Sequence, residues 1–416
     1  MNPADISFKD LAIIRCPHAA YDYLLADAPV FHDKKAGFYI VSRYEDCRQL
    51  LGDPSALTSE HVGELLRGAT NPERAARIRD LFAEKGWPRE RAIGHYEGED
   101  YRERRRLFES FLRAGKVRGY EDDIRDIAYA LVDTIAADGE AEMVGQFCEQ
   151  MSLRIIFRLL GAPADALPIV KQALDAMIDN LGFVGSEVDE IASAEKEIAA
   201  QHYFMAMIEA KRAKPDDTIL SAFVNAELPS GMRMTDEQIL MHVMLDLFMA
   251  GGETTSKALA SGILMLCRDP ELQERLAADP DAGLRGFAEE VLRLEGPAAG
   301  LYRAAKRDID LHGTRIPKGA LVSLRVAAAN RDGCQFSDPA TLDVERGNAA
   351  THLSFGSGAH ACLGSYLARR ELYWGFRALV ERLEDIRVAP GTEISHMPNW
   401  MFRAIETLPV TFKRRT

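Results

Sequence analysis

A lone cysteine in a glycine-rich loop is the residue of this sequence best suited to carry chemistry. Cys362 lies in the run FGSGAHACLG at residues 355–364, where Gly356, Gly358 and Gly364 surround it. A thiol is held as an anion only where a metal ion or nearby backbone N–H groups neutralise it. Residues from 365 onward read as a helix, whose N-terminal dipole also favours negative charge. We therefore predict that Cys362 is the thiolate ligand of a metal; the alternative is a buried structural cysteine.

A second candidate site lies inside a long apolar helix. A capping box of Thr235 and Gln238 predicts where the helix begins, and Asp269-Pro270 predicts where it ends. A helix of roughly 33 residues, rising about 1.5 Å each, would cross a whole domain. Its middle reads AGGETT at residues 250–255, although adjacent glycines and a carboxylate are each unfavourable in a buried helix. We predict that this interruption serves function; a kink packed against a neighbouring helix is the alternative.

Length, composition and charge limit the classes of protein to which this chain can belong. The 416 residues contain no Pro/Gly/Ser-rich linker or repeat, so we predict a single domain over residues 1–416, and a monomer. The six cysteines lack metal-finger spacing, and the N-terminus lacks a signal-peptide layout. No apolar run is long enough to cross a membrane, and the net charge of −13 disfavours nucleic acid. We expect a cytoplasmic protein with no membrane or nucleic-acid partner.

A minor β-sheet is predicted beside the helices. Residues 316–319 read as a turn between short strands, and residues 37–42 have the composition of a further strand. The stretch from 328 to 332 continues the same alternation, so we assign it to the sheet as well.

At Cys362 and in the long helix the sequence resembles the cytochrome P450 family. That family's loop is Phe-Gly-x-Gly-x-His/Arg-x-Cys-x-Gly, and its helix carries Ala/Gly-Gly-x-Asp/Glu-Thr; residues 355–364 and 250–254 match both motifs. The resemblance covers nearly the whole chain. It implies a mainly α fold with minor β, in which a haem lies between a long central helix and the Cys-bearing loop. It further implies that Glu253 and Thr254 guide protons, and that the helix glycines make room for dioxygen.

The resemblance assigns further residues to haem b (iron protoporphyrin IX) and to the scaffold behind it. For the haem propionates it implies Arg303, His360 and Arg105; the usual histidine partner of that arginine is Tyr101 here, and its hydroxyl can still donate. Residues expected to lie against the macrocycle are Ala250, Gly251, Phe355, Gly356 and Gly364. Residues that match the family's buried ion-pair triad, to which we assign a folding role, are Glu290, Arg293 and Arg346.

The activity implied by the resemblance is monooxygenation, in which one atom of O₂ enters a C–H bond of a small-molecule substrate. Electrons from NAD(P)H are expected through a separate ferredoxin and its reductase, because no flavin or iron–sulfur module is recognised in the chain. Arg102, Arg106 and Arg113 share one helix face, which we predict binds the ferredoxin; a solvated face is the alternative. The competing functions are a peroxide-driven peroxygenase, which would not need Glu253 and Thr254, and a non-catalytic haem-binding sensor.

The predicted substrate is a compact, mostly apolar ring compound, a terpenoid or a substituted aromatic, which is hydroxylated or O-demethylated. Its expected contacts are Ile93, Leu247, Ala250, Ala299, Leu301 and Trp400. Burial of apolar surface favours such a ligand by about 25 cal/mol per Å². The resemblance implies that an arginine-rich segment, residues 67–91, covers the pocket. If an arginine such as Arg89 or Arg91 points inward, an anionic aromatic acid becomes the alternative substrate.

Overall fold

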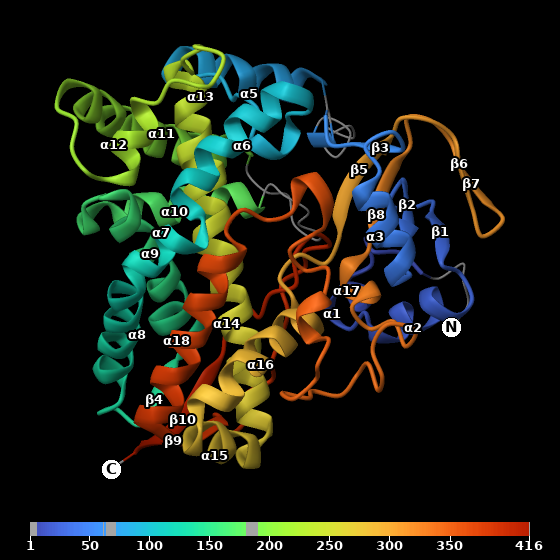
Figure 1. Cartoon of the computed structure of the whole chain (residues 1–416), viewed down its shortest axis with the longest axis vertical. Coiled ribbons are helices and arrows are strands. Elements are labelled where there is room, and N and C mark those ends of the chain that lie inside the picture. Colours follow the sequence, from blue (N-terminus) through green and yellow to red (C-terminus); the bar gives the residue numbers. More distant parts are fainter. Residues whose placement is uncertain (1–5, 61, 64–71, 180–189, 416) are drawn as a thin grey trace.

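Helices make up most of the molecule, on the left of Figure 1. The computed structural model describes residues 6–60, 62–63, 72–179 and 190–415. Its α-helices are α1 (Leu11–Arg15), α2 (His18–Ala26), α3 (Tyr44–Gly52), α5 (Pro72–Lys85), α6 (Gly98–Leu112), α7 (Ala114–Val117), α8 (Glu121–Ile135), α9 (Glu149–Leu160), α10 (Leu167–Asp179), α11 (Glu190–Ala213), α12 (Ile219–Val224), α13 (Asp236–Met241), α14 (Ala250–Arg268), α15 (Pro270–Ala278), α16 (Pro280–Glu295), α17 (Val326–Ala329) and α18 (Ser365–Arg382). The mainly helical class predicted from the sequence is confirmed.

Three small sheets accompany the helices. Their strands are β1 (Val30–Asp33), β2 (Phe38–Val41), β3 (Leu57–Thr58), β4 (Glu140–Glu142), β5 (Leu301–Ala305), β6 (Ile309–Leu311), β7 (Thr314–Ile316), β8 (Leu321–Leu324), β9 (Leu383–Val388) and β10 (Pro409–Arg414). The largest sheet has the order β1-β2-β8-β5-β3, with β2 and β8 parallel and Tyr39 opposite Val322. It lies on the right of Figure 1, far from the β4-β10-β9 sheet near the C-terminus.

The predicted strands at 37–42 and around 316–319 are confirmed as β2, β7 and β8. The assignment of residues 328–332 to the sheet is wrong. Ala328 and Ala329 end helix α17 instead, and both alanines are fully buried. Small side chains let this short helix pack closely, and close packing of that kind leaves no period-2 signal in the sequence.

One long helix crosses the centre of the helical part. Helix α13, a π-helical segment (His242–Met249) and α14 follow one another without a break over residues 236–268. The predicted capping box is present, since Thr235 Oγ1 accepts a hydrogen bond from Gln238 N at 3.3 Å and Gln238 Oε1 accepts one from Thr235 N at 3.2 Å. The wider π turn was not predicted; such turns inside α-helices often occur at functional positions.

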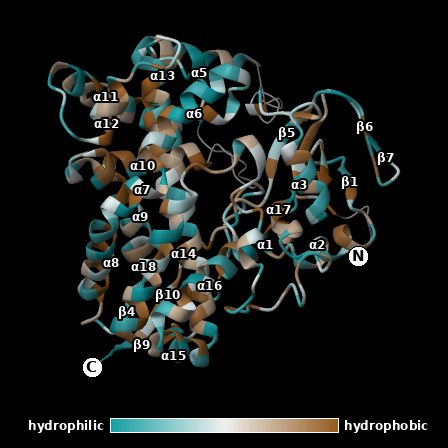
Figure 2. Cartoon of the chain, viewed as in Figure 1, coloured by the Kyte–Doolittle hydropathy of each residue, from teal (hydrophilic) through white to brown (hydrophobic). Residues whose placement is uncertain are grey.

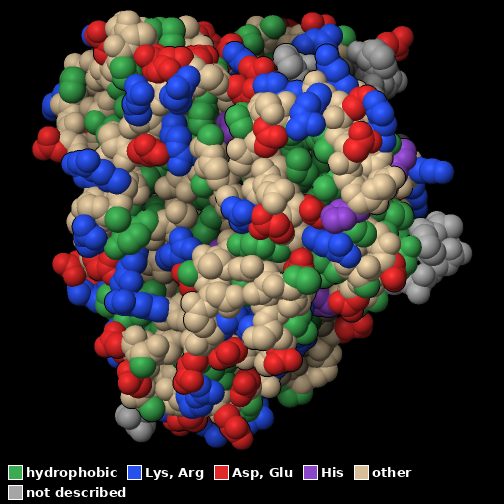
Figure 3. Space-filling model, turned by 45° about the vertical axis from the view of Figure 1, so that its right-hand side comes forward, with side chains coloured by type: hydrophobic (Ala, Val, Ile, Leu, Met, Phe, Trp, Pro, Cys, Tyr) green, Lys and Arg blue, Asp and Glu red, His purple; other side chains and the backbone are tan. Residues whose placement is uncertain are grey.

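Helix α14 is the support on which the other site-bearing elements pack. It contacts α9, α16 and α18, and α16 leads into β5 while α18 follows Cys362. Outer helices such as α5 and α15 are largely hydrophilic (Figure 2), and charges of both signs are interspersed over the face drawn in Figure 3. Within the described ranges, no helix is long and apolar enough to span a membrane.

Candidate active site

The loop before α18 holds Cys362 in a fixed conformation. The Cys362 N–H donates to the Phe355 carbonyl at 2.8 Å, which closes the loop on itself. Gly356 and Gly358 have φ values of 69° and 73°, a left-handed conformation that glycine adopts without strain. A Cβ at Gly358 would also lie 2.7 Å from the Leu51 carbonyl oxygen. Gly356 and Gly358 therefore let the loop turn sharply against α3. These are two of the three glycines around Cys362 that the sequence analysis singled out.

The electrostatics of the thiol follow from its place in this loop. Burial raises the pKa of Cys362, whereas the backbone N–H groups of Gly364 and Ser365 and the charges of Arg105 and Arg369 lower it. The free thiol alone is therefore held protonated, and a cation at the sulfur would reverse this preference.

A cavity of about 250 Å³ separates Cys362 from the long helix. Helix α14 contributes Ala250, Gly251, Thr254, Thr255 and Ala258 to its wall. The remaining lining residues are Leu51, Leu292, Pro297, Ala298, Leu301, Arg303, Ser354, Phe355, Gly356, His360, Cys362, Gly364, Leu367, Ala368, Glu371 and Leu372. The structure thus brings the predicted metal ligand, the predicted alcohol and most of the predicted macrocycle contacts to one space.

Thr254 and Glu253 face different spaces, although the sequence led us to expect them in one site. The Thr254 hydroxyl lines the cavity and donates to the Ala250 carbonyl at 2.7 Å. Glu253 is 6% exposed and lines a second cavity of about 240 Å³, where Lys257 Nζ donates to its carboxylate at 2.5 Å. Consecutive helical residues point about 100° apart, which is why neighbours in sequence reach opposite sides of the helix.

The second cavity is lined by charged side chains from three helices. Glu149 of α9 and Asp175 of α10 face Glu253 and Lys257 across it. Lys171 lies 3.1 Å from Glu149 and also pairs with Asp175. Burial, together with the charge of Glu253, raises the pKa of Glu149, whereas Lys171 lowers it.

The adjacent glycines of α14 are explained by helix packing. A Cβ at Gly251 would lie 2.6 Å from Ile156 Cδ1, and one at Gly252 would lie 2.6 Å from Leu153 Cδ2, both on α9. The missing side chains thus allow α14 to approach α9, as the alternative interpretation of a packed helix expects. Gly251 also lines the cavity beside Thr254, and a role of the glycines in making room for dioxygen stays a prediction.

Arg303 and His360 provide a polar edge to the cavity. Arg303 donates to the Tyr302 carbonyl at 2.8 Å and, within the described ranges, forms no ion pair. Burial lowers the pKa of Arg303, whereas the charge of Glu97 raises it. Burial and the charge of Arg303 lower the pKa of His360 to about 4. An anionic group at this edge of the cavity would fit both side chains.

Tyr101 and Arg105 lie on the outer side of the cysteine loop. Tyr101 donates to the Ala359 carbonyl at 2.7 Å, and its ring stacks on His360 with 4.1 Å between centroids. Arg105 donates to Tyr101 Oη at 2.8 Å and to the Ala361 carbonyl at 2.9 Å. Neither residue lines the cavity. In this structure the pair clamps the loop from outside, and its contact with a haem propionate stays a prediction.

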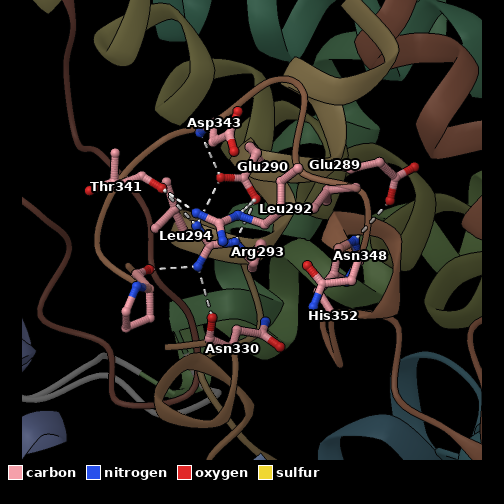
Figure 4. Close-up of polar contacts among 12 residues, drawn as sticks. Glu289, Glu290, Leu292, Arg293, Leu294, Asn330, Thr341, Asp343, Asn348 and His352 are labelled. Carbon is pink, nitrogen blue, oxygen red and sulfur yellow. Dashed lines mark hydrogen bonds and ion pairs between the residues drawn. The ribbon is translucent and has the colours of Figure 1, made fainter. Parts of the chain in front are cut away.

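The predicted ion-pair triad is brought together, and Figure 4 shows the contacts of its Glu290 and Arg293. Arg293 donates twice to Glu290, at 2.6 and 2.8 Å, and both residues are fully buried. Arg346 Nε lies 3.2 Å from Glu290 Oε1 without hydrogen-bond geometry. Arg293 also donates to the Asn330 and Thr341 carbonyls at 3.0 Å each. The triad therefore fastens α16 to the loop that precedes the cysteine.

The predicted substrate contacts divide into two groups. Ala250 and Leu301 line the cavity, whereas Ile93, Leu247, Ala299 and Trp400 do not. Trp400 packs on Phe38 and Tyr302, with ring centroids 5.4 and 4.9 Å away. It is a core residue beside the large sheet, so its assignment to the substrate is withdrawn.

The arginines singled out from the sequence have different surroundings. Arg102 and Arg106 are exposed on α6, near Glu99 at 3.2 and 3.8 Å. Arg106 and Arg113 line an open groove of about 560 Å³ that also reaches Cys362. In the predicted lid, Arg89 pairs with Glu197 of α11, while Arg91 lies over the Tyr96 ring. Arg67 lies outside the described residues.

Three residues near the site were not predicted from the sequence. Lys257 pairs with Glu253, and the i,i+4 spacing could have indicated it. Glu371 lines the cavity and is 1% exposed, and burial raises its pKa well above the ordinary value. Asp246 lies in the π-helical segment and accepts two hydrogen bonds.

Comparison with known proteins places this fold and site in a family. The profile of the family described as Cytochrome P450 matches residues 57–413. The chain is 30% identical over 411 residues to the cytochrome P450 monooxygenase PikC of Streptomyces venezuelae, covering 96% of this chain and 91% of that protein. It is 28% identical over 404 residues to the biotin biosynthesis cytochrome P450 of Bacillus subtilis, covering 96% and 97%.

Solved structures agree with the sequence relatives. Cytochrome P450 CYP109Q5 from Chondromyces apiculatus has a TM-score of 0.85 and 27% identity, with 100% of both chains covered. The chain belongs to the cytochrome P450 family and has its fold, as predicted. Since relatives are named monooxygenases and hydroxylases, the protein is an oxidoreductase of the P450 monooxygenase class. Family membership implies haem, O₂ and reducing equivalents from a partner.

Proposed function

We propose that the protein inserts one oxygen atom of O₂ into a compact, mostly apolar organic substrate, a terpenoid or a substituted aromatic, by hydroxylation or O-demethylation. The observation that carries this proposal is the cavity between Cys362 and α14, whose wall is mainly apolar. Such a wall selects ligands by burial and shape, and it excludes water from the reacting position. We propose that residues 1–416 form a single haem-thiolate domain.

Haem b, held in this cavity, would supply the activation of O₂. The residues proposed to hold the haem are Cys362, through its thiolate, and Arg303 and His360, beside its propionate groups. The fit rests on Arg303, which lines the cavity and forms no ion pair among the described residues, and on the loop that presents the sulfur to the cavity. Tyr101 and Arg105 are assigned a supporting role, because they hold the Ala359 and Ala361 carbonyls from outside.

Proton delivery is assigned to Thr254, with Glu253 as the supply. The Thr254 hydroxyl donates to a backbone carbonyl, so its oxygen is free to accept a proton-bearing water in the cavity. Glu253 holds its carboxylate toward the second cavity, where Lys257 keeps it in place. Protons would enter on that side of α14 and reach Thr254 around the helix.

Electrons are proposed to come from NAD(P)H through a reductase and a ferredoxin that binds beside α6. Support comes from the groove that reaches Cys362 and carries Arg105, Arg106 and Arg113 along its wall. An acidic protein surface would complement these charges. Glu109 also lines the groove and reduces the positive potential there.

The test is a ligand panel on the haem-loaded protein with a generic ferredoxin and reductase. We expect apolar ring compounds to shift the haem spectrum, to stimulate NAD(P)H consumption and to be recovered oxygenated. Binding confined to carboxylate-bearing aromatics would favour the anionic substrate instead. The structure gives this alternative less support, because Arg89 is already paired with Glu197. Activity only with added peroxide would favour a peroxygenase, and ligand binding without electron consumption would favour a sensor.

A further inference from the structure

A carboxylate lies inside the long helix at a position that the catalytic assignments do not use. Asp246 belongs to the π-helical segment, and its side chain is 11% exposed. The adjacent Leu247 and Phe248 are buried in the apolar core. A charged group in such surroundings is costly unless it has a partner of opposite charge.

Two donors hold one oxygen of this carboxylate. Asp246 Oδ2 accepts from the Ile93 N–H at 2.9 Å and lies 2.7 Å from His242 Nδ1. Since a carboxylate only accepts, Nδ1 carries the proton. The His242 ring is fully buried against Phe108 and Phe223, and its Nε2 has no hydrogen-bond partner in the described ranges. Both contacts of the carboxylate are therefore made at Oδ2, which leaves Oδ1 outside them.

The structural contacts of Asp246 do not require its charge. An asparagine oxygen in the same place could accept both hydrogen bonds. In the part of the chain that the structure describes, no Lys or Arg pairs with Asp246, and Oδ1 receives no hydrogen bond. Oδ1 of the carboxylate is thus available to a hydrogen-bond donor on a ligand.

The position of Asp246 along the helix directs it to the substrate side. Ala250 and Thr254 are four residues apart in α14 and share one face of it, and Asp246 lies about one turn before Ala250 in the π-helical segment. Ala250 and Thr254 line the cavity opposite Cys362. Leu245, Asp246, Met249 and Ala250 are the incompletely buried residues of this stretch, so the open face of the helix continues from the cavity to Asp246. Eight residues separate Asp246 from Thr254, and at a rise of at most about 1.5 Å each they span no more than roughly 12 Å.

We propose that Asp246 is a substrate-binding residue, and that the substrate is an otherwise apolar molecule with one protonated nitrogen at the end remote from the oxidised carbon. This inference rests on the proposed function and narrows its substrate class to alkylammonium compounds. The ammonium group donates to Asp246 Oδ1, while the apolar remainder extends along the open face of the helix toward Thr254. A charge-assisted hydrogen bond of this kind is stronger than a neutral one.

The experiment compares three probes of equal length on the haem-loaded protein: a phenylalkyl dimethylamine, the corresponding neutral ether and the corresponding carboxylate. Dissociation constants are measured by equilibrium dialysis, so the result does not depend on activity; an amine bound directly to the metal would keep its advantage in Asp246→Asn. At neutral pH the amine is expected to bind about tenfold more tightly than the ether, as one charge-assisted hydrogen bond implies, and the carboxylate more weakly than either.

The variants separate charge from structure. Asp246→Asn should reduce amine binding to the level of the ether and leave ether binding unchanged. Asp236→Asn, which removes a charge at the exposed start of the same long helix, should leave the preference for the amine intact. If the Asn variant does not retain haem, Asp246→Glu, which keeps the charge, must keep the preference for the amine.

Equal binding of amine and ether by the wild-type protein overturns the proposal, and so does an undiminished preference in Asp246→Asn. The spectrum of the ferrous carbonyl complex is recorded for each variant. A wild-type protein that has the thiolate-type spectrum but does not prefer the amine overturns only the substrate inference. A wild-type protein that lacks this spectrum overturns the proposed function.

Discussion

Thr254 belongs to the long helix, and its side chain lines the cavity that Cys362 also lines. Its hydroxyl is oriented by the Ala250 carbonyl at 2.7 Å, and it is proposed to hold a proton-bearing water there. Thr254→Ala should leave haem binding intact but divert reduced oxygen to hydrogen peroxide. The measurement is product and peroxide formed per NAD(P)H consumed. Thr254→Ser, which restores the hydroxyl, should recover most of the coupling; equal coupling in wild type and Thr254→Ala would remove this residue from proton delivery.

Glu371 is a buried carboxyl that the proposed reaction does not use. Burial raises its pKa well above the ordinary value of 4.5. The folded protein therefore keeps a proton that the unfolded chain loses, so this group lowers the free energy of unfolding as pH rises above its ordinary pKa.

Glu371→Gln removes this titration and should be more stable than the wild type at neutral pH. The gain should shrink toward about pH 4, where both states of the wild type are protonated. Urea denaturation of the haem-loaded protein at several pH values measures the difference. A pH dependence of stability identical to that of the wild type would show that Glu371 is not held protonated.

For single residues, type and spacing predicted which side chains lie close together. They predicted less reliably the direction in which each side chain points. The cysteine loop, Arg303, His360 and the triad of Glu290, Arg293 and Arg346 lie where their motifs indicated. The orientation of Glu253 away from the cavity and the burial of Trp400 in another cluster were missed. Both depend on how helices and strands pack, and local sequence patterns do not encode that packing.

Among the elements, α14 is positioned by close contact with α18. A Cβ at Gly262 would lie 2.2 Å from the Phe376 ring and 3.1 Å from Val291, and both neighbours are fully buried. Gly262→Ala should therefore lower the free energy of unfolding by about 1–3 kcal/mol, even though alanine favours the helix. Urea denaturation measures this change.

A matched control is Gly115→Ala in helix α7, where an added Cβ meets only the end of the Arg118 side chain at 3.9 Å. That variant should be neutral or slightly stabilised. Equal effects of the two substitutions would show that the contact between α14 and α18 does not depend on Gly262.

Element boundaries follow local chemistry where caps and turns exist. The capping box at Thr235 and the turn at residues 316–319 were predicted correctly. The π-helical segment was missed because the apolar residues around it continue without a break. Its wider turn leaves no mark on local periodicity.

Viewed as a whole, the molecule combines a net charge of −13 with a basic face on α6. Arg102 and Arg106 are both more than half exposed there, beside a groove that reaches Cys362. We expect reduction by an acidic ferredoxin to slow with increasing salt, because screening weakens long-range attraction. Charge reversal at Arg102 and Arg106 should slow it several-fold at low salt, as measured by stopped-flow reduction.

The control for this surface is Arg315→Glu on the β6–β7 hairpin, which is equally exposed but lies at the far side of the molecule (Figure 1). It should change the reduction rate little. Salt-independent reduction, or the same loss of rate for Arg315→Glu as for the α6 variants, would refute docking at α6.

Cys362 as the thiolate ligand of a haem iron is the central claim, and the ferrous carbonyl spectrum tests it most directly. A thiolate opposite carbon monoxide moves the Soret band strongly to longer wavelength, whereas an imidazole or a neutral ligand does not. The wild-type protein and a Cys148→Ser variant should both show the red-shifted band, since Cys148 is buried away from the cavity. Cys362→His should lose it; a Cys362→His protein that retains the band would contradict the account.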